Sequence, residues 1–475
     1  MARVLGLDVG TTTVSGVIVD TSDGQLVARA GSEHRADVVD TSPDRAGWAE
    51  QDPHQLDRAA RQVLSDLAAA AGPDVAAIGL TGQMHGLLLL DADGQPLGNL
   101  ITWQDRRAAP IIPELLKSAS AEAWTGTGCQ LATGYLAATL AWMVRNAAVP
   151  TSARRCCFIH DWLAARLGGS EPCTDPSDAG SVGIFDLAAK AWSDELIAAL
   201  GLPVALLPPI RESGAVIGHL QPAVAKDVGL RSDVPVCNAI GDNQASFLGS
   251  VGDPEGSVLV NIGTGGQISW VVDDLAHPPG MEIRYLPNDR LIAVGAGICG
   301  GRTYAWLEAF YREVVAAFTD TGAPAAGQLY ERMNELAAAA PADAAGLRCR
   351  PTLSGTRQDP DLRGLLDGLD LTNMTPANLT RAVLTGIVDE LRGFYRSYDA
   401  ATLSAHRAVV GSGNAIRRNR ALANIIAERF GMPVRTPRHH EEAAYGAALL
   451  AAVTAGVLPD LATAGQLIRY ETVAE

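Results

Sequence analysis

A glycine–threonine turn occurs twice in this chain, and only the first copy is preceded by an aspartate. GLDVGTTT places Asp8 two residues before the turn at Gly10, and NIGTGG places Asn261 two residues before the turn at Gly263. Glycine lets the backbone approach a ligand closely, and threonine hydroxyls and amides can donate to oxyanions. A carboxylate beside such a turn can hold a divalent cation. We expect the matched pair to grip a polyphosphate; two ordinary β-hairpins are the alternative.

A second carboxylate stands at the end of the apolar stretch VCNAI. Asp242 follows Gly241 there and precedes a predicted helix. The position suits an N-cap, which is the commonest use of aspartate at a helix start. It also suits a general base, because the helix N-terminus keeps a carboxylate ionised and able to accept a hydroxyl proton. The two roles are compatible, and the sequence leaves both open.

Three further stretches place polar side chains at strand ends or tight turns. TGQMHG brackets His85 between glycines, TWQDRR ends a strand at Trp103 and Asp105, and GSG at 411–413 opens a helix. Tryptophan stacks on sugar rings, carboxylates bind hydroxyl groups, and a glycine turn before a helix suits a phosphate or a nucleoside. The ordinary alternatives are a packed histidine, a core tryptophan and a simple strand–helix turn.

Other motifs are absent or weak. No lysine follows a glycine, so the chain has no Walker phosphate loop. GAGICG at 295–300 matches the dinucleotide-binding pattern, but no acidic residue follows in a second strand about 20 residues on. HHEE at 439–442 lacks a spaced partner for a metal, so we predict a surface or loop segment there.

The predicted elements are α/β throughout. Residues 3–20 and 256–273 each predict a pair of antiparallel strands, and residues 53–71 and 302–318 predict helices. Thr375 and Pro376 predict the N-cap and first residue of another helix. AAYGAALLAAVTAGVL, near the C-terminus, is too short for a membrane span and predicts a buried helix.

Length and composition narrow the class of protein. The 475 residues favour two domains, because a single core stops growing at about 250–300 residues. A net charge of −16 argues against a nucleic-acid or anionic-membrane surface. The 7 cysteines contain no C-x-x-C pair and indicate free thiols in a reducing compartment. The chain opens on a strand pattern, so we expect a cytoplasmic protein, and a homodimer is compatible with the sequence.

Taken together, the motifs resemble those of the FGGY carbohydrate kinases over nearly the whole chain. The matching stretches are, in order, GLDVGTTT, GWAEQDP, GQMHG, TWQDRR, IGDNQASF, NIGTGG, VVGSGNAIRRN and EEAAYGAALLA. Several motifs in one order are far more specific than any one alone. The resemblance implies an α/β fold of two duplicated actin-like (ribonuclease H-like) domains flanking a deep cleft. Residues 1–250 would form the sugar-binding domain and residues 251–475 the ATP-binding domain.

The resemblance also implies roles for these residues, with ATP and Mg²⁺ as cofactors. Asp8 would serve the Mg²⁺–phosphate region, and Asp242 would be the catalytic base. The implied sugar contacts are Gln83, Met84, His85, Trp103, Asp105, Asp242 and Asn243. The implied phosphate contacts are Thr11, Thr12, Gly263, Thr264 and Gly265, and the implied adenosine contacts are Gly411, Gly413, Asn414 and Arg417. The two turns would then clamp one nucleotide.

The substrate class follows from finer resemblances. GQMHG is more similar to ketose kinases than to glycerol kinases, and GWAEQDP resembles xylulokinases. ATGYLAATLAW, FIHDWLAARLGG and GDNQAS are closer to sedoheptulokinases. We expect phosphorylation of a primary hydroxyl of a ketose, with sedoheptulose ahead of D-xylulose and of other pentuloses or polyols. The alternative of another class is an actin- or chaperone-like nucleotide switch, which shares the paired turns but needs none of the sugar-side motifs.

Overall fold

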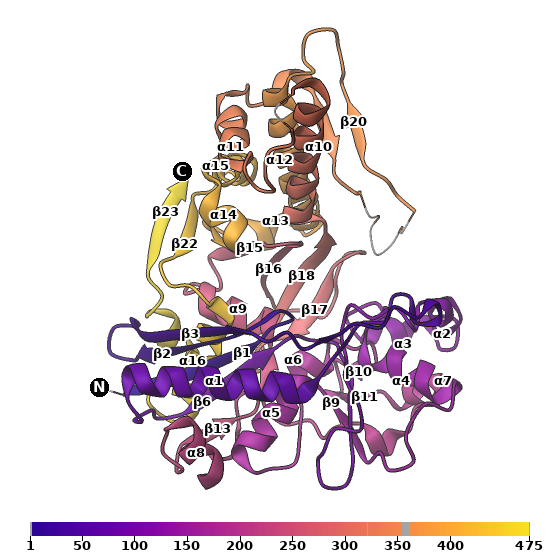
Figure 1. Ribbon diagram of the computed structural model, residues 1–475, viewed down its shortest axis with the longest axis vertical. Helices are drawn as coiled ribbons and strands as arrows, with labels where there is room; N and C mark the ends of the chain where they lie inside the picture. Colours follow the sequence, from indigo (N-terminus) through magenta and orange to yellow (C-terminus); the bar gives the residue numbers. More distant parts are fainter. Residues whose placement is uncertain (1, 321, 354, 356–358, 360, 475) are drawn as a thin grey trace.

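The computed structural model describes residues 2–320, 322–353, 355, 359 and 361–474. Within them, two mixed seven-stranded sheets form the centres of two lobes (Figure 1). The N-terminal half surrounds the lower sheet, and the orange segments of the C-terminal half surround the upper one. Separate hydrophobic cores fill the lobes, one containing Leu7 and Leu64 and the other Val260 and Ile387.

The first sheet has the order β12-β13-β6-β1-β2-β3, with β14 also paired to β6. β1, β2 and β3 form an antiparallel meander, β6 and β13 continue parallel to β1, and β12 is antiparallel at the edge. The strands are β1 (Arg3–Val9), β2 (Thr13–Asp20), β3 (Leu26–Glu33), β6 (Ile78–Gly82), β12 (Val216–His219), β13 (Pro235–Cys237) and β14 (Ile240–Gly241).

The second sheet has the order β17-β18-β16-β15-β21-β22-β23 and repeats these directions strand by strand, with β17 added at one edge. The strands are β15 (Ser257–Ile262), β16 (Gly266–Val272), β17 (Glu282–Tyr285), β18 (Leu291–Ile298), β21 (Ala408–Ser412), β22 (Val434–Pro437) and β23 (Tyr470–Ala474). Asp8 and Asn261 are the next-to-last residues of the equivalent strands β1 and β15. The duplication expected from the repeated turn is therefore confirmed.

Short strands and helices complete the two lobes. The minor strands are β4 (Asp37–Val38), β5 (Glu50–Gln51), β7 (Leu88–Leu90), β8 (Leu100–Ile101), β9 (Arg155–Cys157), β10 (Phe185–Asp186), β11 (Ala191–Trp192), β19 (Arg348–Arg350) and β20 (Leu365–Asp367). The longer helices are α1 (Pro53–Ala71), α4 (Leu136–Arg145), α5 (Ile159–Gly168), α9 (Asp242–Ser250), α10 (Gly300–Phe318), α11 (Tyr330–Ala339), α12 (Pro376–Arg396), α15 (Arg420–Phe430) and α16 (Glu442–Thr454). The shorter ones are α2 (Ile112–Leu115), α3 (Ala121–Gly126), α6 (Pro176–Ala179), α7 (Asp194–Leu200), α8 (Pro222–Val228), α13 (Ala400–Ser404), α14 (Asn414–Arg418) and α17 (Leu461–Gly465).

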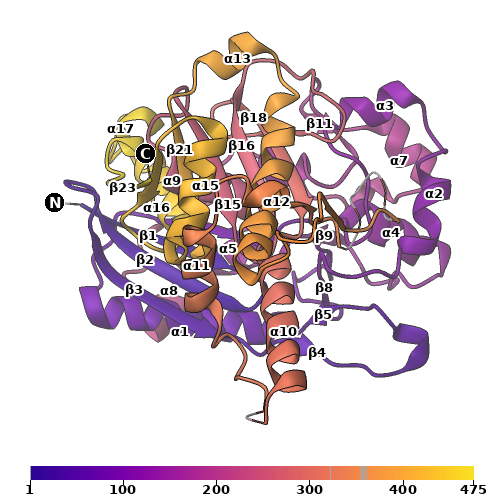
Figure 2. The same ribbon diagram turned by 90° about the horizontal axis from the view of Figure 1, so that it is seen from above.

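Most predicted helices appear where the sequence places them. α1 spans the predicted residues and lies along β2 and β3 of the first sheet (Figure 2). α12 begins at Pro376, and the hydroxyl of Thr375 accepts a hydrogen bond from the amide of Asn378 at 3.2 Å, as its predicted N-cap role requires. α10 begins at Gly300, two residues before the predicted start. Among the described residues, no helix is both long and apolar enough to span a bilayer.

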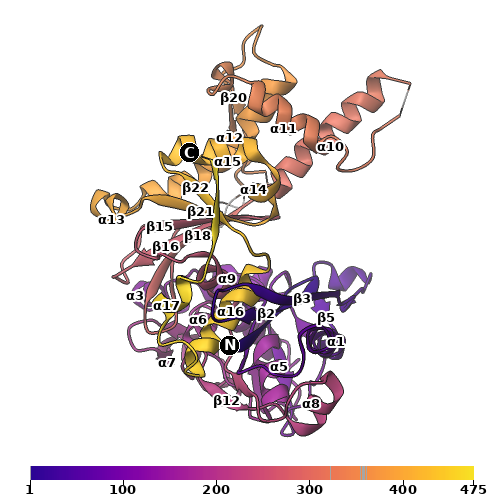
Figure 3. The same ribbon diagram turned by 90° about the vertical axis from the view of Figure 1, so that its left-hand side faces the viewer.

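The C-terminal helix α16 packs on the first sheet although it follows the second sheet in sequence. It lies against β1, β2 and β6 and against α9, where Figure 3 shows it inside the N-terminal lobe. Glycines permit the contact: a Cβ on Gly6 would lie 1.8 Å from the Ala444 carbonyl oxygen, and one on Gly446 would lie 1.9 Å from that of Ala245. The predicted buried helix is confirmed; the boundary at residue 250 stays a prediction.

Substituting Gly446→Ala tests how far the fold depends on this close approach. The new methyl group would meet a backbone oxygen, which cannot yield unless α9 and α16 move apart. We expect the free energy of unfolding in urea to fall by about 1–3 kcal/mol. Gly393→Ala in α12 is the matched control: outside the backbone of α12 itself, none of the described residues has an atom within 4 Å of the added Cβ, so its stability should hold or rise. Equal stability of the two variants would contradict the packing argument.

Candidate active site

The first turn follows β1 and is held rigidly. The carbonyl of Thr11 accepts a hydrogen bond from Gln51 Nε2 at 2.7 Å, and the hydroxyl of Thr11 accepts one from Trp103 Nε1 at 3.0 Å. Thr12 beside it is exposed. Asp8 Oδ1 is buried and accepts no hydrogen bond from the described residues. The turn therefore leaves a carboxylate oxygen and a threonine available to a ligand.

The second turn is open to solvent and touches the start of α10. Gly263, Thr264 and Gly265 are exposed. The amide of Gly301 donates to the Gly263 carbonyl, and the amide of Arg302 donates to the Thr264 carbonyl, each at 2.9 Å. The N-terminus of α10, where a helix favours anions, therefore adjoins the turn.

Two glycine segments pack directly on this second turn. A Cβ on Gly300 would lie 2.3 Å from the Gly265 carbonyl oxygen, so GAGICG ends in a close backbone contact that the sequence did not suggest. Gly413, with φ +85°, precedes α14, and a Cβ there would lie 2.6 Å from the Ile262 carbonyl oxygen. Residues 411–414, with Asn414 exposed, therefore lie beside the turn as expected for one nucleotide site.

Asp242 opens α9 beside Asp8. Its expected N-cap role is wrong: the N-cap is Gly241, and Asp242 is the first helical residue. Burial raises the pKa of Asp8 well above its ordinary value, and the nearby negative charge of Asp242 raises it further. Burial and the charge of Asp178 raise the pKa of Asp242 to about 6, while His160 opposes the shift. The two predicted acidic residues thus share one electrostatic environment.

Arg284, from the second sheet, lies near Asp242, and no sequence motif predicted it. It lies on β17, is 3% exposed, and its Nη1 is 3.9 Å from Met84 Sδ. Its positive charge lowers the pKa of Asp242. Asn243 provides a second link, because its Nδ2 donates to Gln267 Oε1 on β16 at 2.8 Å. The two halves of the chain therefore meet at Asp242.

Met84 and Asn243 lie at the start of α9, and His85 follows Met84 in the chain; their sugar-side roles stay predictions. Met84 packs against Gly241, where an added Cβ would lie 2.7 Å from its Cε. His85 has φ +76°, and its ring stacks on Tyr135 with centroids 4.3 Å apart. Asn243 Oδ1 is buried and receives no hydrogen bond from the described residues, so it can accept one from a ligand hydroxyl.

Gln83 and Asp105 are engaged by protein partners. Gln83 is 3% exposed, and its Nε2 donates to Gln51 Oε1 at 2.8 Å. Asp105 is 1% exposed, pairs with Arg107 at 2.9 Å and accepts the amide of Ala49 at 2.8 Å. These contacts occupy the groups expected to bind sugar hydroxyls. The geometry argues for positioning roles and against direct sugar contact by either side chain.

Arg417 and the HHEE segment are also used internally. Arg417 donates to the carbonyls of Pro437 and His439 at 2.6 and 2.8 Å and to Glu442 Oε1 at 2.6 Å, which argues against an adenosine contact. His439 is 9% exposed, and its Nε2 lies 2.7 Å from the Gly249 carbonyl oxygen. The prediction of a surface or loop segment is confirmed for residues 439–441, where His439 is a buried loop residue, and is wrong for Glu442, which opens α16.

The surroundings of Asp8 fit a divalent cation. Besides burial, the negative charges of Asp242 and Glu441 raise its pKa, and Oδ1 has no donor among the described residues. A cation with oxygen ligands would relieve this repulsion and favour the ionised carboxylate. Asp8 is therefore the residue best placed to hold Mg²⁺, directly or through water.

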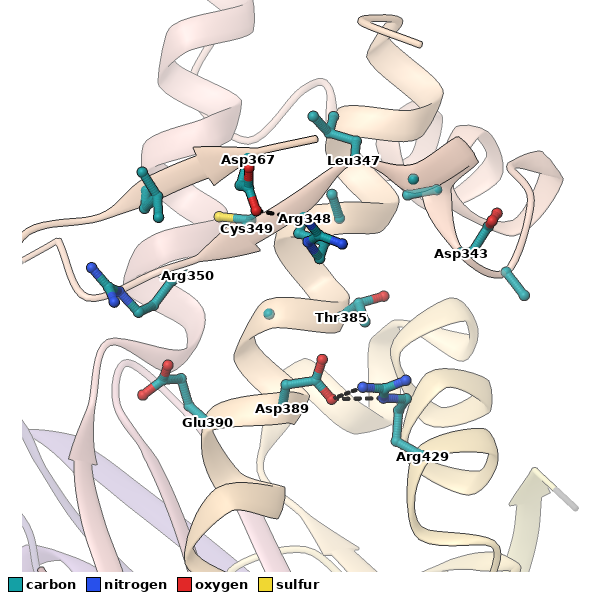
Figure 4. Close-up of a pocket in the computed structure, with 16 residues that line it drawn as sticks. Asp343, Leu347, Arg348, Cys349, Arg350, Asp367, Thr385, Asp389, Glu390 and Arg429 are labelled. Atoms are coloured by element: carbon teal, nitrogen blue, oxygen red, sulfur yellow. Dashed lines mark hydrogen bonds and ion pairs between the residues drawn. The ribbon is translucent and has the colours of Figure 1, made fainter. Parts of the chain in front are cut away.

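A separate cavity of about 570 Å³ lies between the β19–β20 hairpin and α12 (Figure 4). Four of its charged groups form two ion pairs, Arg348 with Asp367 at 2.7 Å and Arg429 with Asp389 at 2.6 Å. None of the residues expected to bind sugar or nucleotide is among those that line it. The cavity thus has no part in the site around Asp242.

Comparisons with known proteins agree with this arrangement. The family model for the N-terminal domain of the FGGY family of carbohydrate kinases matches residues 3–249, and that for the C-terminal domain matches residues 275–455. A glycerol kinase of Geobacter sp. (strain M21) is 29% identical, over 98% of this chain and 93% of the relative. A xylulose kinase of Bacillus subtilis is 26% identical, over 100% and 92%. The crystal structure of xylulose kinase from Rhodospirillum rubrum has a TM-score of 0.85 and 27% identity, over 99% and 93%.

Fold and comparisons together define an ATP-dependent sugar phosphotransferase built from two actin-like, ribonuclease H-like domains. The chain belongs to the FGGY family of carbohydrate kinases. Its cofactors are therefore ATP and Mg²⁺, and the alternative of a nucleotide switch without sugar chemistry is set aside.

Asp8→Asn tests the assignment of the metal-side carboxylate. We expect the Mg²⁺ concentration for half-maximal activity to rise at least about tenfold, because an amide cannot supply the charge of the carboxylate. Sugar binding, followed by calorimetry, should change little. Asp20→Asn is the control, because it makes the same change of aspartate to asparagine at the end of β2 that lies away from the turn. It should leave the Mg²⁺ titration unchanged. A parental Mg²⁺ requirement in Asp8→Asn would refute the assignment.

Proposed function

We propose that the enzyme phosphorylates a primary hydroxyl of a ketose, with Asp242 as the general base. Asp242 accepts the hydroxyl proton as that oxygen attacks the γ-phosphorus of ATP, and ADP leaves. Positioning and charge stabilisation dominate such a transfer, because little covalent chemistry falls to the protein. The observation that supports this most strongly is the place of Asp242, at the start of α9 and where both halves of the chain converge.

The electrostatics of Asp242 suit a base that works near neutral pH. Its pKa of about 6 lies close to the operating range, where a base combines ionisation with useful proton affinity. Arg284 contributes a positive charge from the second domain, so closure of the domains would keep the base ionised. Closure would also exclude water and limit wasteful hydrolysis of ATP.

The remaining roles divide between the two turns and the loops near α9. Thr12 and the turn at 263–265 would orient the phosphates, and Asp8 would hold the cation. Mg²⁺, when bound, neutralises charge on the transferring phosphoryl group. Met84, His85 and Asn243 would bind the sugar, while Gln83 and Asp105 support the loops beneath it. A cytoplasmic location, where ATP is available, fits this activity.

Two ketoses are candidates, each on its own observation. The stretches around Leu140, His160 and Asp242 resemble sedoheptulokinases, which favours a seven-carbon ketose. The xylulose kinases of Bacillus subtilis and Rhodospirillum rubrum are similar to the whole chain, which favours D-xylulose. We retain sedoheptulose as the proposal and D-xylulose as its direct competitor.

Asp242→Asn is expected to reduce the turnover number by about 10²–10⁴-fold with near-normal ATP affinity. In the parental enzyme, kcat/KM should fall as pH drops below about 6, because protonation of Asp242 removes the base. Steady-state kinetics of both enzymes at a series of pH values from about 5 to about 8 would measure both effects.

Asp194→Asn is the control for this substitution, since Asp194 is exposed and is also the first residue of a helix, α7. It should keep parental kinetics at every pH. Parental turnover in Asp242→Asn would exclude Asp242 as the base while leaving the family assignment intact.

A coupled assay of ADP formation over a panel of acceptors tests the sugar. The panel is sedoheptulose, D-xylulose, D-ribulose, L-ribulose, erythritol and glycerol. We expect the highest kcat/KM for sedoheptulose, with glycerol at least about tenfold poorer, because a site built for several hydroxyls leaves polar groups unpaired around a smaller polyol. A highest value for D-xylulose would establish the competing assignment, and one for glycerol would exclude a ketose kinase.

A further inference from the structure

A buried histidine–aspartate pair lies behind Asp242, and the mechanism above does not use it. His160 on α5 and Asp178 on α6 are both 0% exposed, and His160 Nε2 lies 2.7 Å from Asp178 Oδ2. Asp161, next in sequence, is also 0% exposed. Burying so many ionisable groups is unfavourable unless each charge is offset by a partner.

A metal site is the competing interpretation, since His160, Asp161 and Asp178 offer ligand atoms within 4.8 Å of one another. The ring already has a hydrogen-bonding partner on one side, whereas Nδ1 has none among the described residues. Nε2 already lies at hydrogen-bonding distance from Asp178, and Nδ1 faces Gly82, where an added Cβ would be 2.9 Å away. Burial lowers the pKa of His160, but Asp178 and Asp161 outweigh it and raise the pKa to about 9. A protonated imidazole has no lone pair for a metal.

Hydrogen bonds connect the pair to the start of the base helix. The amide of Gly241, the N-cap of α9, donates to Ser177 Oγ at 3.0 Å, and Gln244 Nε2 donates to the Ser177 carbonyl at 3.2 Å. Asp175 holds this short helix in turn: it accepts the Ser177 hydroxyl at 2.7 Å and the Asp178 amide at 3.0 Å. α6 therefore fixes the two residues that flank the first turn of α9.

The same segment also contacts the predicted sugar side. The carbonyl oxygen of Ser181 lies 2.8 Å from His85 Nδ1, and the Ser181 hydroxyl donates to the Asp178 carbonyl at 2.7 Å. Displacement of α6 would thus move both the base helix and a sugar-side histidine. An anchor for α6 would act on catalysis without touching substrate.

We propose that His160 and Asp178 form a positioning pair for Asp242. The imidazolium anchors Asp178, and α6 with it, against the start of α9, and its charge offsets the carboxylates that face it. This inference rests on the proposed role of Asp242 as the base. The carboxylates whose charges act on His160, or on which its charge acts, are Asp8, Asp161, Asp178 and Asp242.

The two members of the pair act on Asp242 in opposite directions. Removing the charge of His160 leaves the charge of Asp178 unopposed, which makes Asp242 harder to ionise. Removing the charge of Asp178 makes Asp242 easier to ionise as long as Asp161 and Asp242 keep His160 protonated. A merely structural defect would shift both variants the same way or neither. The sign of the pH shift therefore separates positioning by charge from general destabilisation.

Single-turnover phosphoryl transfer, measured by rapid quench from pH 5 to 8, is the test. In His160→Gln we expect the acid limb to move up by about one pH unit and the rate at pH 5 to fall about tenfold, with sugar KM changed much less than kcat. In Asp178→Asn the limb should move down. His160→Lys, which keeps a donor and a positive charge, should restore the parental limb.

His406→Gln is the matched control, because His406 also bonds a single side chain, with Nδ1 3.0 Å from the Tyr395 hydroxyl, in the second lobe. It should leave the limb in place. Thermal unfolding and metal analysis of each purified variant complete the comparison. If His160→Gln does not fold, the parental limb of His160→Lys and the lowered limb of Asp178→Asn still decide.

Three results would overturn the inference. One is an unshifted acid limb in His160→Gln, with or without lower stability. Another is a shift of the same sign in His160→Gln and Asp178→Asn. The third is a tightly held metal in the parental enzyme that His160→Gln loses. Each would leave the base assignment standing as long as Asp242→Asn remains inactive.

Discussion

The structure concentrates buried negative charge where its two halves meet. Asp8, Asp178 and Asp242 come from three different elements, yet the charge of Asp178 acts on Asp242 and the charge of Asp242 acts on Asp8. Such a group is stable only where protons, cations or paired side chains offset it. His160 offsets it from the side of the protein core, and Mg²⁺ would offset it from the side of the nucleotide. Catalysis and ligand binding are therefore joined, because the carboxylates repel one another least when the nucleotide and its cation are present.

Close backbone packing makes this concentration possible. α16 crosses β1 at Gly6 and crosses α9 at Gly249 and Gly446, with no room for a Cβ at any of the three. Helices that pack through ordinary side chains lie about 8–10 Å apart, so side chains here would move α9 away from β1. A segment from the C-terminal half of the chain thus sets the separation between the strand that carries Asp8 and the helix that carries Asp242.

The sequence predicted the parts of this structure that are local or repeated. Hydrophobic periodicity located α1, the Thr375–Pro376 pair located the start of α12, and the two copies of the turn predicted a strand pair in each half. Partners distant in the chain were not predictable. Arg284 and Asp178 belong to no spaced motif, and they become neighbours of Asp242 only after the sheets assemble.

The same limit explains the residues whose implied roles the geometry does not support. Asp105 and Arg417 match family motifs, and their residue types suit hydroxyl and nucleotide recognition. In the fold, Asp105 forms an ion pair with Arg107, and Arg417 forms one with Glu442. These ion pairs hold loops in place. A motif identifies a charge that is needed, but only the packed structure shows which group it faces.

The two halves have diverged into complementary electrostatic roles. In the second sheet, the place of Asp8 is taken by Asn261, whose Oδ1 lies beside Gly413 and its turn. An amide there adds no negative charge near the phosphates, whereas a second carboxylate would repel them. The strand without a counterpart in the described first sheet, β17, carries Arg284 toward Asp242. The first half thus supplies Asp8 and Asp242, and the second half supplies a neutral turn and the charge of Arg284, together with the carboxylate of Glu441, which also acts on Asp8.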